Sequence, residues 1–313
     1  MRTIITIGNF DGVHRGHQAI LAEARQLADD HGACVLAMTF DPMPISVLRP
    51  GAGPPHLASI DQRVETLTRY GAHDVIVVKP TQEILQQEAT RFIASLIEQH
   101  HAIGFVEGED FRFGHKRSGD MAMLADLGGK QGFAVRALPR VETTLSDCSA
   151  APISSSLVRW LVGRGRVEDA QACLGRPFEL RGEIVKGEQR GRTIGVPTAN
   201  LDPNAWRGMI APMDGVYAGY VAFDDAPDDG HPAAISVGVK PTFGHDQLTI
   251  EAHLIDYRAD NPDALYGRRA RFGFARWVRD QYPFPGIEAL TEQVRRDIDA
   301  ARDLMAEHAS PYD

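Results

Sequence analysis

The segment Thr6–His17, TIGNFDGVHRGH, constrains the fold of this chain more than any other part of it. The isoleucine-rich stretch Met1–Ile7 leads into it and is typical of a buried parallel strand. Gly8 ends this strand, and Gly12 and Gly16 then keep side chains away from a place where backbone N–H groups meet an anion. A helix predicted over Gln18–Asp29 points the positive end of its dipole at the same place. The segment therefore predicts a strand, a glycine turn and a helix start that bind the phosphates of a nucleotide.

His14 and His17 give this segment its chemistry. They stand three residues apart and so share one face of the first helical turn. Two imidazoles in that place donate hydrogen bonds to phosphate oxygens and offset the charge of a departing pyrophosphate. The alternative is that both are surface or capping residues, but the full pattern G-x-F-D-G-x-H-x-G-H favours the phosphate site.

Length and charge limit the class of protein. A chain of 313 residues is long enough for two domains. The net charge of -9, from 33 basic and 42 acidic residues, argues against nucleic-acid or acidic-membrane partners, because those partners need a basic face. No run approaches the ~20 apolar residues that cross a bilayer, and the N-terminus lacks the apolar core of a signal peptide, so we expect a cytoplasmic protein. Three widely spaced cysteines favour neither a disulfide framework nor a zinc site.

The first half alternates helical periodicity with short apolar strands. The predicted strands after the first are Cys34–Phe40, Val75–Val78, Ile103–Glu107 and Phe133–Leu138. This order predicts a doubly wound α/β sheet, in which ligands bind beyond the carboxyl ends of the strands. Two polar loops rich in glycine or proline, TFDPMP and EGEDFRFGHKRSGD, follow strands at that edge and suit a planar ring and a phosphate. The alternative for the Phe-Arg-Phe run is a partly buried edge strand.

A serine cluster precedes the next helix. Ser154, Ser155 and Ser156 are predicted N-cap residues, and Arg159 lies one turn into the helix. From there Arg159 is able to make a bidentate contact with a phosphate. A solvated surface charge is the alternative.

The pattern changes at Pro177 to short alternating runs, namely Phe178–Lys186, Gly215–Phe223, Ala233–Val239 and Thr249–Asp256, separated by glycines and a DDAPDDGHP turn. We expect a small closed β-barrel. Apolar residues at three- and four-residue intervals from Ile287 to Met305 then predict one amphipathic helix that packs on it. The predicted domains are residues 1–176 and 177–313.

A second glycine-rich segment, GEQRGRTIGVPTANL, lies within the predicted barrel. Its glycines permit tight turns near phosphates and its arginines supply local positive charge. Pro197 stiffens the chain before Thr198 and Asn200, whose oxygens are hard ligands suited to Mg²⁺. The alternative is a basic hairpin loop.

The segment TIEAHLIDY places Glu251 and His253 on one face of a strand. A carboxylate near Mg²⁺ and a sugar-like hydroxyl is a reasonable general base. Taken alone, Glu251 is more simply a solvated strand residue.

These motifs together resemble one family. The Thr6–His17 segment is similar to the phosphate-binding signature of HxGH nucleotidyltransferases and, more narrowly, to the adenylyltransferase half of bacterial bifunctional riboflavin kinase/FAD synthetases. P-T-A-N, E-A-H-L-I-D, the serine cluster, SVGVKPTFG and LYGRRARFGFARWVRDQYPF resemble further stretches of that family, in the family's order, from Ile5 to about Arg302. The resemblance implies phosphorylation of riboflavin to FMN by the second domain, and adenylylation of FMN to FAD by the first, with release of pyrophosphate.

The resemblance also implies a set of site residues. Glu251 takes the proton of the ribityl hydroxyl, while His14, His17 and Arg159 stabilise the transition state of adenylylation. Thr198 and Asn200 hold Mg²⁺ with ATP. The implied ATP and phosphate contacts are Gly8, Phe10, Asp11, Gly12, Gly16, Ser154, Ser155, Ser156, Gly187, Arg190, Gly191, Arg192, Gly195 and Pro197. The implied flavin contacts are Asp110, Phe111, Phe113, Pro241, Thr242 and Phe243.

Three positions depart from the family pattern. Met43 stands where many members have histidine, Val196 replaces the usual phenylalanine before P-T-A-N, and Val239 stands where threonine is common. The alternatives are therefore a riboflavin kinase with a degenerate adenylyltransferase domain, or a flavin-binding regulator without catalysis. A cytidylyltransferase of the HxGH superfamily explains the first half only. The expected partners are riboflavin, FMN, FAD and ATP, without nucleic acid or membrane, in a monomer or weak homo-oligomer.

Overall fold

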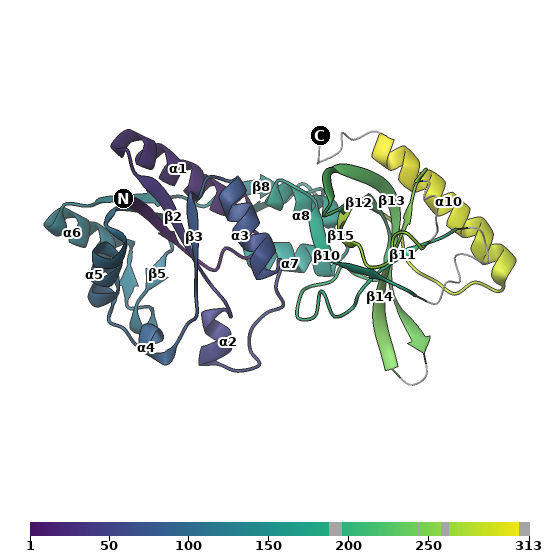
Figure 1. Cartoon of the computed structure of the whole chain (residues 1–313), viewed down its shortest axis with the longest axis horizontal. Coiled ribbons are helices and arrows are strands. Elements are labelled where there is room, and N and C mark those ends of the chain that lie inside the picture. Colours follow the sequence, from purple (N-terminus) through teal and green to yellow (C-terminus); the bar gives the residue numbers. More distant parts are fainter. Residues whose placement is uncertain (188–195, 243–244, 258–262, 307–313) are drawn as a thin grey trace. The chain divides into compact units, whose positions relative to one another are not determined.

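The computed structural model of the chain describes residues 1–187, 196–242, 245–257 and 263–306, without the side chains of residues 228 and 240–247. It divides into two compact units. The first unit holds Met1–Thr144 and Ser149–Ser155, and the second holds Leu145–Cys148 and Ser156–Asp313. The five-stranded sheet lies in the first unit and the β-barrel in the second (Figure 1).

A five-stranded parallel sheet forms the centre of the first unit. Its strand order is β3-β2-β1-β4-β7, and every neighbouring pair is parallel. The strands are β1 (Thr3–Ile7), β2 (Cys34–Phe40), β3 (Asp74–Val78), β4 (Ala102–Gly108) and β7 (Ala134–Leu138). The predicted strands are confirmed to within two residues at each end, and the doubly wound α/β fold is confirmed with them.

Helices cover both faces of this sheet. On one face, α1 (Arg15–His31) and α3 (Ile60–Arg69) pack against Ile4, Val35 and Val106. On the other, α5 (Ala89–His100) and α6 (Met121–Gln131) pack against Ile5, Ile7 and Phe105. Successive strand residues thus serve opposite cores, which explains why these strands are continuous apolar runs.

Short elements complete the first unit. Three small helices lie in its connections, namely α2 (Pro44–Leu48), α4 (Gln82–Leu85) and η1 (His115–Arg117). Two antiparallel pairs lie beside the main sheet, β5 (Arg112–Phe113) with β6 (Gly119–Asp120), and β8 (Glu142–Thr144) with β9 (Ala150–Pro152). The Phe-Arg-Phe run therefore includes a short strand, as the alternative interpretation of that run proposed.

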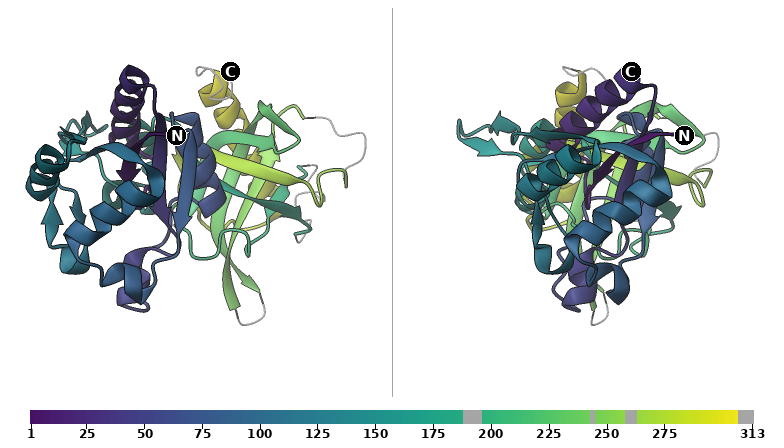
Figure 2. Two further views of the ribbon diagram at one scale, coloured as in Figure 1. Left: turned by 60° about the vertical axis from the view of Figure 1, so that its left-hand side comes forward. Right: turned by 90° about the vertical axis from the view of Figure 1, so that its left-hand side faces the viewer.

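The second unit is built on a closed barrel of strand order β10-β11-β14-β13-β12-β15. Its strands are β10 (Phe178–Val185), β11 (Ala199–Leu201), β12 (Gly215–Phe223), β13 (Ala226–Thr242), β14 (His245–Leu254) and β15 (Arg269–Arg279). The C-terminal helix α10 (Ile287–Ala306) packs Ile298, Ala301 and Met305 against Ala218 and Tyr220 of β12. The predicted barrel and its helix are confirmed, and Figure 2 shows the barrel in two further views.

Two features of the barrel differ from the predictions. The predicted turn DDAPDDGHP is mostly strand, because β13 begins at Ala226 after a short turn at Asp224 and Asp225. Ala226 and residues 230–232 pair with β12 alone, and an irregularity in the register takes up residues 227–229. Edge positions and bulges of this kind tolerate proline. The strands β11 and β15 are absent from the predicted set; β11 has three residues, and β15 is rich in arginine.

Helices α7 (Ser155–Gly163) and α8 (Val167–Leu174) pack largely with the second unit, with α8 against β10 and β15. In the second unit, the backbone N–H of Trp277 in β15 donates to Glu168 in α8 at 3.1 Å. Among the described residues, no helix combines the length and apolar character needed to span a membrane.

Candidate active sites

The turn between β1 and α1 folds as the glycine pattern requires. Phe10, Gly12 and Val13 have φ angles of 46°, 80° and 38°, so the chain reverses sharply through left-handed conformations. Helix α1 starts at Arg15, and His14 precedes it in an extended conformation without a side-chain capping bond. Such a helix start presents backbone N–H groups and a positive dipole end to an anion.

The two histidines lie against each other at this helix start. Their rings stack with centroids 3.7 Å apart and planes 18° apart, and Phe10 meets His17 edge-on at 5.1 Å. A Cβ on Gly16 would stand 3.1 Å from the ring of His14, so a larger residue there displaces the stack. The predicted sharing of one face is confirmed.

His17 is a neutral imidazole at neutral pH. Burial lowers its pKa well below the ordinary value, and the nearby His14 and Arg63 lower it further. Its Nδ1 receives or donates no hydrogen bond within the described part of the chain. A neutral imidazole offers one N–H donor, and an arriving phosphate adds negative charge that favours protonation.

These groups line a cavity of about 420 Å³ beyond the carboxyl ends of the strands, all of it within the first unit. The predicted residues on its wall are Gly8, Phe10, His14, Gly16, His17, Asp110, Phe111, Ser154 and Ser155. Asp110 pairs with Arg140 at 3.1 Å, both largely exposed. The hydroxyl of Ser155 donates to the carbonyl of Asp11 at 2.8 Å and so ties its loop to the turn.

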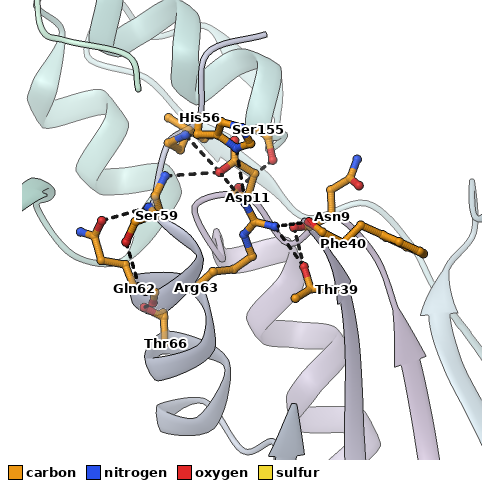
Figure 3. A network of polar contacts seen from close by, with 12 residues as sticks. Asn9, Asp11, Thr39, Phe40, His56, Ser59, Gln62, Arg63, Thr66 and Ser155 are labelled. Atoms are coloured by element: carbon orange, nitrogen blue, oxygen red, sulfur yellow. Dashed lines mark hydrogen bonds and ion pairs between the residues drawn. The ribbon is translucent and has the colours of Figure 1, made fainter. Parts of the chain in front are cut away.

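The side chain of Asp11 lies off the cavity wall (Figure 3). Its carboxylate is buried, accepts hydrogen bonds from the backbone N–H groups of Leu57 and Ala58 at 3.0 and 3.3 Å, and is absent from the cavity wall. Arg63, equally buried, lies 3.9 Å from it and donates to Thr39 and to the carbonyl of Phe40. The geometry makes Asp11 an anchor that holds the turn, and its implied phosphate contact stays a prediction.

Other predicted residues of the first site also lie off the cavity wall. Phe113 is buried in the core and stacks on Phe111 at 5.4 Å, so it supports the wall from behind. Gly12 is in the turn without lining the cavity. Ser156 and Arg159 belong to the second unit, and their roles at this cavity stay predictions. Met43 is buried just before α2 and is not part of the wall.

The polar residues of the second site meet through strand register. Asn200 of β11 pairs with Glu251 of β14, which pairs with Ser236 of β13. The alternate positions Ala199, Ala252 and Ile235 are fully buried, so the polar residues share the opposite face. The predicted division of the Glu251 strand into two faces is confirmed.

This polar face and helix α10 enclose a cavity of about 430 Å³. Thr198, Ser236, Glu251 and His253 line it from the barrel, and Ile287, Leu290, Val294 and Ile298 line it from α10. Apart from Asp297, the residues of α10 on the cavity wall are apolar, whereas the barrel side mixes polar and apolar side chains, which suits an amphipathic ligand with a planar ring.

Oxygen donors suited to a hard cation lie on this face. A Cβ on Gly187 would stand 2.3 Å from Oδ1 of Asn200, so only glycine leaves room for that amide. No cluster of three histidine, cysteine, aspartate or glutamate residues able to hold a metal is found among the residues described. The hydroxyl of Thr198 and the amide oxygen of Asn200 fit a divalent cation that takes its remaining ligands from phosphates and water.

His253 holds the loop that carries Thr198. Its Nδ1 lies 2.9 Å from the carbonyl oxygen of Pro197. Burial lowers the pKa of His253, the Pro197 hydrogen bond and Asp256 oppose this, and Arg302 lowers it further. The neutral ring is therefore a hydrogen-bond donor that fixes Pro197.

Sequence reasoning missed a polar group at the end of this cavity. Arg279 of β15 makes a bidentate contact with Asp297 of α10, at 2.7 and 2.6 Å, and the pair is largely buried. Gln281 donates to Ser236 at 2.7 Å, and Tyr282 and Phe284 lie near the Arg279 guanidinium. In the sequence, the segment that carries Arg279 stood out only by its family resemblance, since an arginine and an aspartate 18 residues apart carry no local signal.

Several predicted residues lie outside the described part. These are Arg190, Gly191, Arg192 and Gly195, the side chains of Pro241 and Thr242, and Phe243. Their assignments stay predictions.

Comparisons with known proteins show the family to which the chain belongs. A family model described as FAD synthetase matches residues 1–155, and one described as riboflavin kinase matches residues 174–305. A bifunctional riboflavin kinase/FMN adenylyltransferase of Escherichia coli K12 is 32% identical over 96% of this chain and 92% of its own length. The chain belongs to the bifunctional riboflavin kinase/FMN adenylyltransferase family. The family member from Pseudomonas fluorescens is 34% identical over 98% of this chain and 94% of its own.

A solved structure shares the fold of the present chain. The crystal structure described as a macrolide-efflux protein from Streptococcus pneumoniae aligns with a TM-score of 0.83 and 28% identity, over 96% of this chain and 94% of that one. Enzymes of the two matched families use ATP together with a divalent metal ion.

Proposed function

We propose that this chain makes FAD from riboflavin in two steps, with a kinase domain at residues 177–313 and an adenylyltransferase domain at residues 1–176. The supporting observation is that one chain carries two separate cavities, one at the HxGH helix start and one on the polar face around Glu251. The first reaction yields FMN and ADP, and the second yields FAD and pyrophosphate.

In the kinase step, Glu251 takes the proton from the terminal ribityl hydroxyl, whose oxygen attacks the γ-phosphorus of ATP as the bond to ADP breaks. Glu251 faces the same cavity as Thr198 and lies beside Asn200 in strand register. The apolar wall from α10 holds the flavin ring, and His253 keeps the Pro197 loop in place.

The divalent ion of the kinase step is proposed to be Mg²⁺, with Thr198 and Asn200 as its protein ligands. When bound with ATP, Mg²⁺ neutralises phosphate charge. The amide oxygen of Asn200, for which Gly187 leaves space, and the hydroxyl of Thr198 are both neutral, in keeping with an ion delivered on a nucleotide.

In the adenylyl step, the phosphate of FMN attacks the α-phosphorus of ATP and pyrophosphate leaves. A phosphate is already a nucleophile at neutral pH, so the protein needs no strong base here. His14 and His17 donate hydrogen bonds to the developing negative charge, aided by the dipole of α1. Arg159 and the serines near it are proposed to complete the phosphate contacts.

We also propose that the protein is cytoplasmic and is a monomer or weak homo-oligomer. Its partners are small molecules, and neither nucleic acid nor a membrane is among them. The net charge of -9 supports the exclusion of polyanionic partners.

Site-directed variants test the division of labour. His17→Ala is expected to lower FAD formation from FMN by about 10²-fold or more, while FMN formation from riboflavin stays at the wild-type rate. Equal loss of both activities in this folded variant contradicts two independent sites. Loss of neither activity contradicts the role of His17.

A further inference from the structure

Glu107 is a buried carboxyl group that the proposed chemistry leaves unused. Its side chain is 2% exposed, it lies near the end of strand β4, and it lines the cavity that contains His14 and His17. The backbone N–H of Ile7 donates to its Oε1 at 2.7 Å. Within the described residues, that is the one hydrogen bond the Glu107 side chain receives, so Oε2 is left for a ligand.

The place of Glu107 in the sheet is unusual. The order β3-β2-β1-β4-β7 changes direction between β1 and β4, and a sheet of this kind opens a ligand crevice at that point. The last pair in the β1–β4 register is Ile5 with Phe105. Beyond this pair, the N–H of Ile7 donates its hydrogen bond to the Glu107 carboxyl and not to a backbone carbonyl of β4. The carboxyl therefore stands in the opening of the crevice.

Strand alternation shows which part of a ligand reaches this carboxyl. Phe105 belongs to the core under α5 and α6, and Glu107, two residues on, shares its face. Helix α1, whose start carries the phosphate site, covers the opposite face. Phe111, which packs against the α5/α6 core, lines the cavity as well and offers a flat surface. A planar ring that stacks on Phe111 would therefore lie on the same face of the sheet as Glu107.

An ionised carboxylate in this position would lack compensation. Its pKa is raised well above the ordinary value because burial removes water, and the hydrogen bond from Ile7 opposes this only in part. The other titratable groups on the cavity wall are His14, His17, Asp110 and Arg140, of which Arg140 is already paired with Asp110. Phosphates in the same cavity disfavour a further negative charge.

We propose that Glu107 binds substrate as a neutral carboxylic acid, donating a hydrogen bond from Oε2 to an acceptor atom on the planar heteroaromatic ring that enters the β1–β4 crevice. Adenine and the flavin ring both carry such acceptors, and the experiment below distinguishes them. This contact rests on the proposed adenylyl transfer.

The test compares two substitutions in the full chain. Glu107→Gln keeps an acceptor for Ile7 and a donor for the ring, and it is neutral at every pH. Glu107→Met keeps the length and removes both groups. Thr6→Val is the matched control, because Thr6 is fully buried in β1 and its hydroxyl has no hydrogen-bond partner among the described residues.

Initial rates of FAD formation are measured against ATP and FMN separately, from pH 6 to 10. We expect Glu107→Gln to keep kcat/KM near the wild-type value at neutral pH and to lack the alkaline loss that ionisation of Glu107 causes in the wild type. We expect Glu107→Met to raise the KM of one substrate by about tenfold, the usual effect of one lost hydrogen bond. A higher KM for ATP identifies adenine, and a higher KM for FMN identifies the flavin.

Two results overturn the proposal. Equal loss in Glu107→Gln and Glu107→Met shows that the negative charge is needed or that the residue only supports the fold. Wild-type KM values in both variants show that no ligand touches Glu107. Absence of FAD formation by the wild type is the failure of the proposed function instead. In that case equilibrium binding of ATP and of FMN to the same variants still decides the contact, with tenfold weaker binding of one ligand to Glu107→Met expected.

Discussion

The carboxylate of Asp11 and the guanidinium of Arg63 face each other inside the first unit, with Oδ1 and Nη2 3.9 Å apart and each side chain 1% exposed (Figure 3). Asp11 comes from the turn that precedes α1, and Arg63 comes from α3. The same guanidinium helps to lower the pKa of His17. One buried ion pair thus fixes the turn and influences the charge of a residue in the phosphate site.

Asp11→Asn is expected to destabilise the first unit by about 3–5 kcal/mol, because it removes the buried negative charge that lies 3.9 Å from the Arg63 guanidinium. Urea unfolding monitored on the full chain measures this loss. Asp29→Asn is the matched control, since its pair with Arg25 is exposed at 47% and 59%, and its removal should cost less than about 1 kcal/mol. Similar losses in the two variants would rule out a special role for the buried pair.

Asp297→Asn is expected to loosen α10 from the barrel. The substitution weakens the bidentate contact with Arg279, whose side chain is 18% exposed, at a cost of about 1–3 kcal/mol. It also raises the KM for riboflavin, since both residues line the second cavity. Arg296→Gln on the same helix removes an exposed pair with Glu292 and should change neither quantity. A riboflavin KM unchanged in Asp297→Asn contradicts the placement of the flavin there.

Gly187→Ala tests the proposed metal ligand. The new methyl group would stand 2.3 Å from Oδ1 of Asn200 and displace that amide, so kinase activity should fall by about tenfold to a hundredfold. FAD formation from FMN should be unaffected. In Gly286→Ala the added methyl group meets nothing within 4 Å, which makes it the control. Full kinase activity in Gly187→Ala would show that Asn200 is not needed at its present position.

Glu251→Gln removes the proposed base while keeping the size of the side chain. Formation of FMN from riboflavin should fall by about 10²-fold or more, and conversion of supplied FMN to FAD should continue at the wild-type rate. Chromatographic separation of the three flavins measures both. A kinase rate within a few-fold of wild type would remove Glu251 from the role of base.

The stability of the first unit should decrease in acid because of His17. Its folded pKa lies well below the ordinary value of 6.5, so below pH 6.5 the unfolded chain binds the proton first. Above pH 6.5 the titration of His17 costs the folded state nothing. As the pH falls from 6.5 toward the folded pKa of His17, the free energy of unfolding decreases by about 1.4 kcal/mol for each pH unit. His17→Gln should flatten the unfolding free energy between pH 7 and 5. An unchanged pH profile in that variant would show that His17 is not the titrating group.

The sequence predicted most elements of the fold because their patterns are local. The isoleucines of β1 and the apolar repeat of α10 each indicate, within a single element, which residues are buried. The β15 strand was missed because its arginines interrupt the apolar pattern, although Arg271 is buried and Arg279 is bound to Asp297.

The candidate sites were predictable where spacing along the chain equals spacing in space. His14 and His17 are one helical turn apart, and their contact followed from that. Asp11 stood out as part of a motif, but nothing in the sequence indicated that its carboxylate accepts hydrogen bonds from Leu57 and Ala58 and pairs with Arg63. Glu107 was missed because its importance comes from the opening between β1 and β4, which exists only after the sheet has formed.

The most direct test of the account follows the flavins made by the purified full chain from riboflavin, ATP and Mg²⁺, with a parallel reaction that starts from FMN. The account predicts that FMN appears first and FAD later in the first reaction, and that FAD forms in the second. Accumulation of FMN without FAD in either reaction would contradict it and would mean a kinase whose first domain has lost adenylyl transfer.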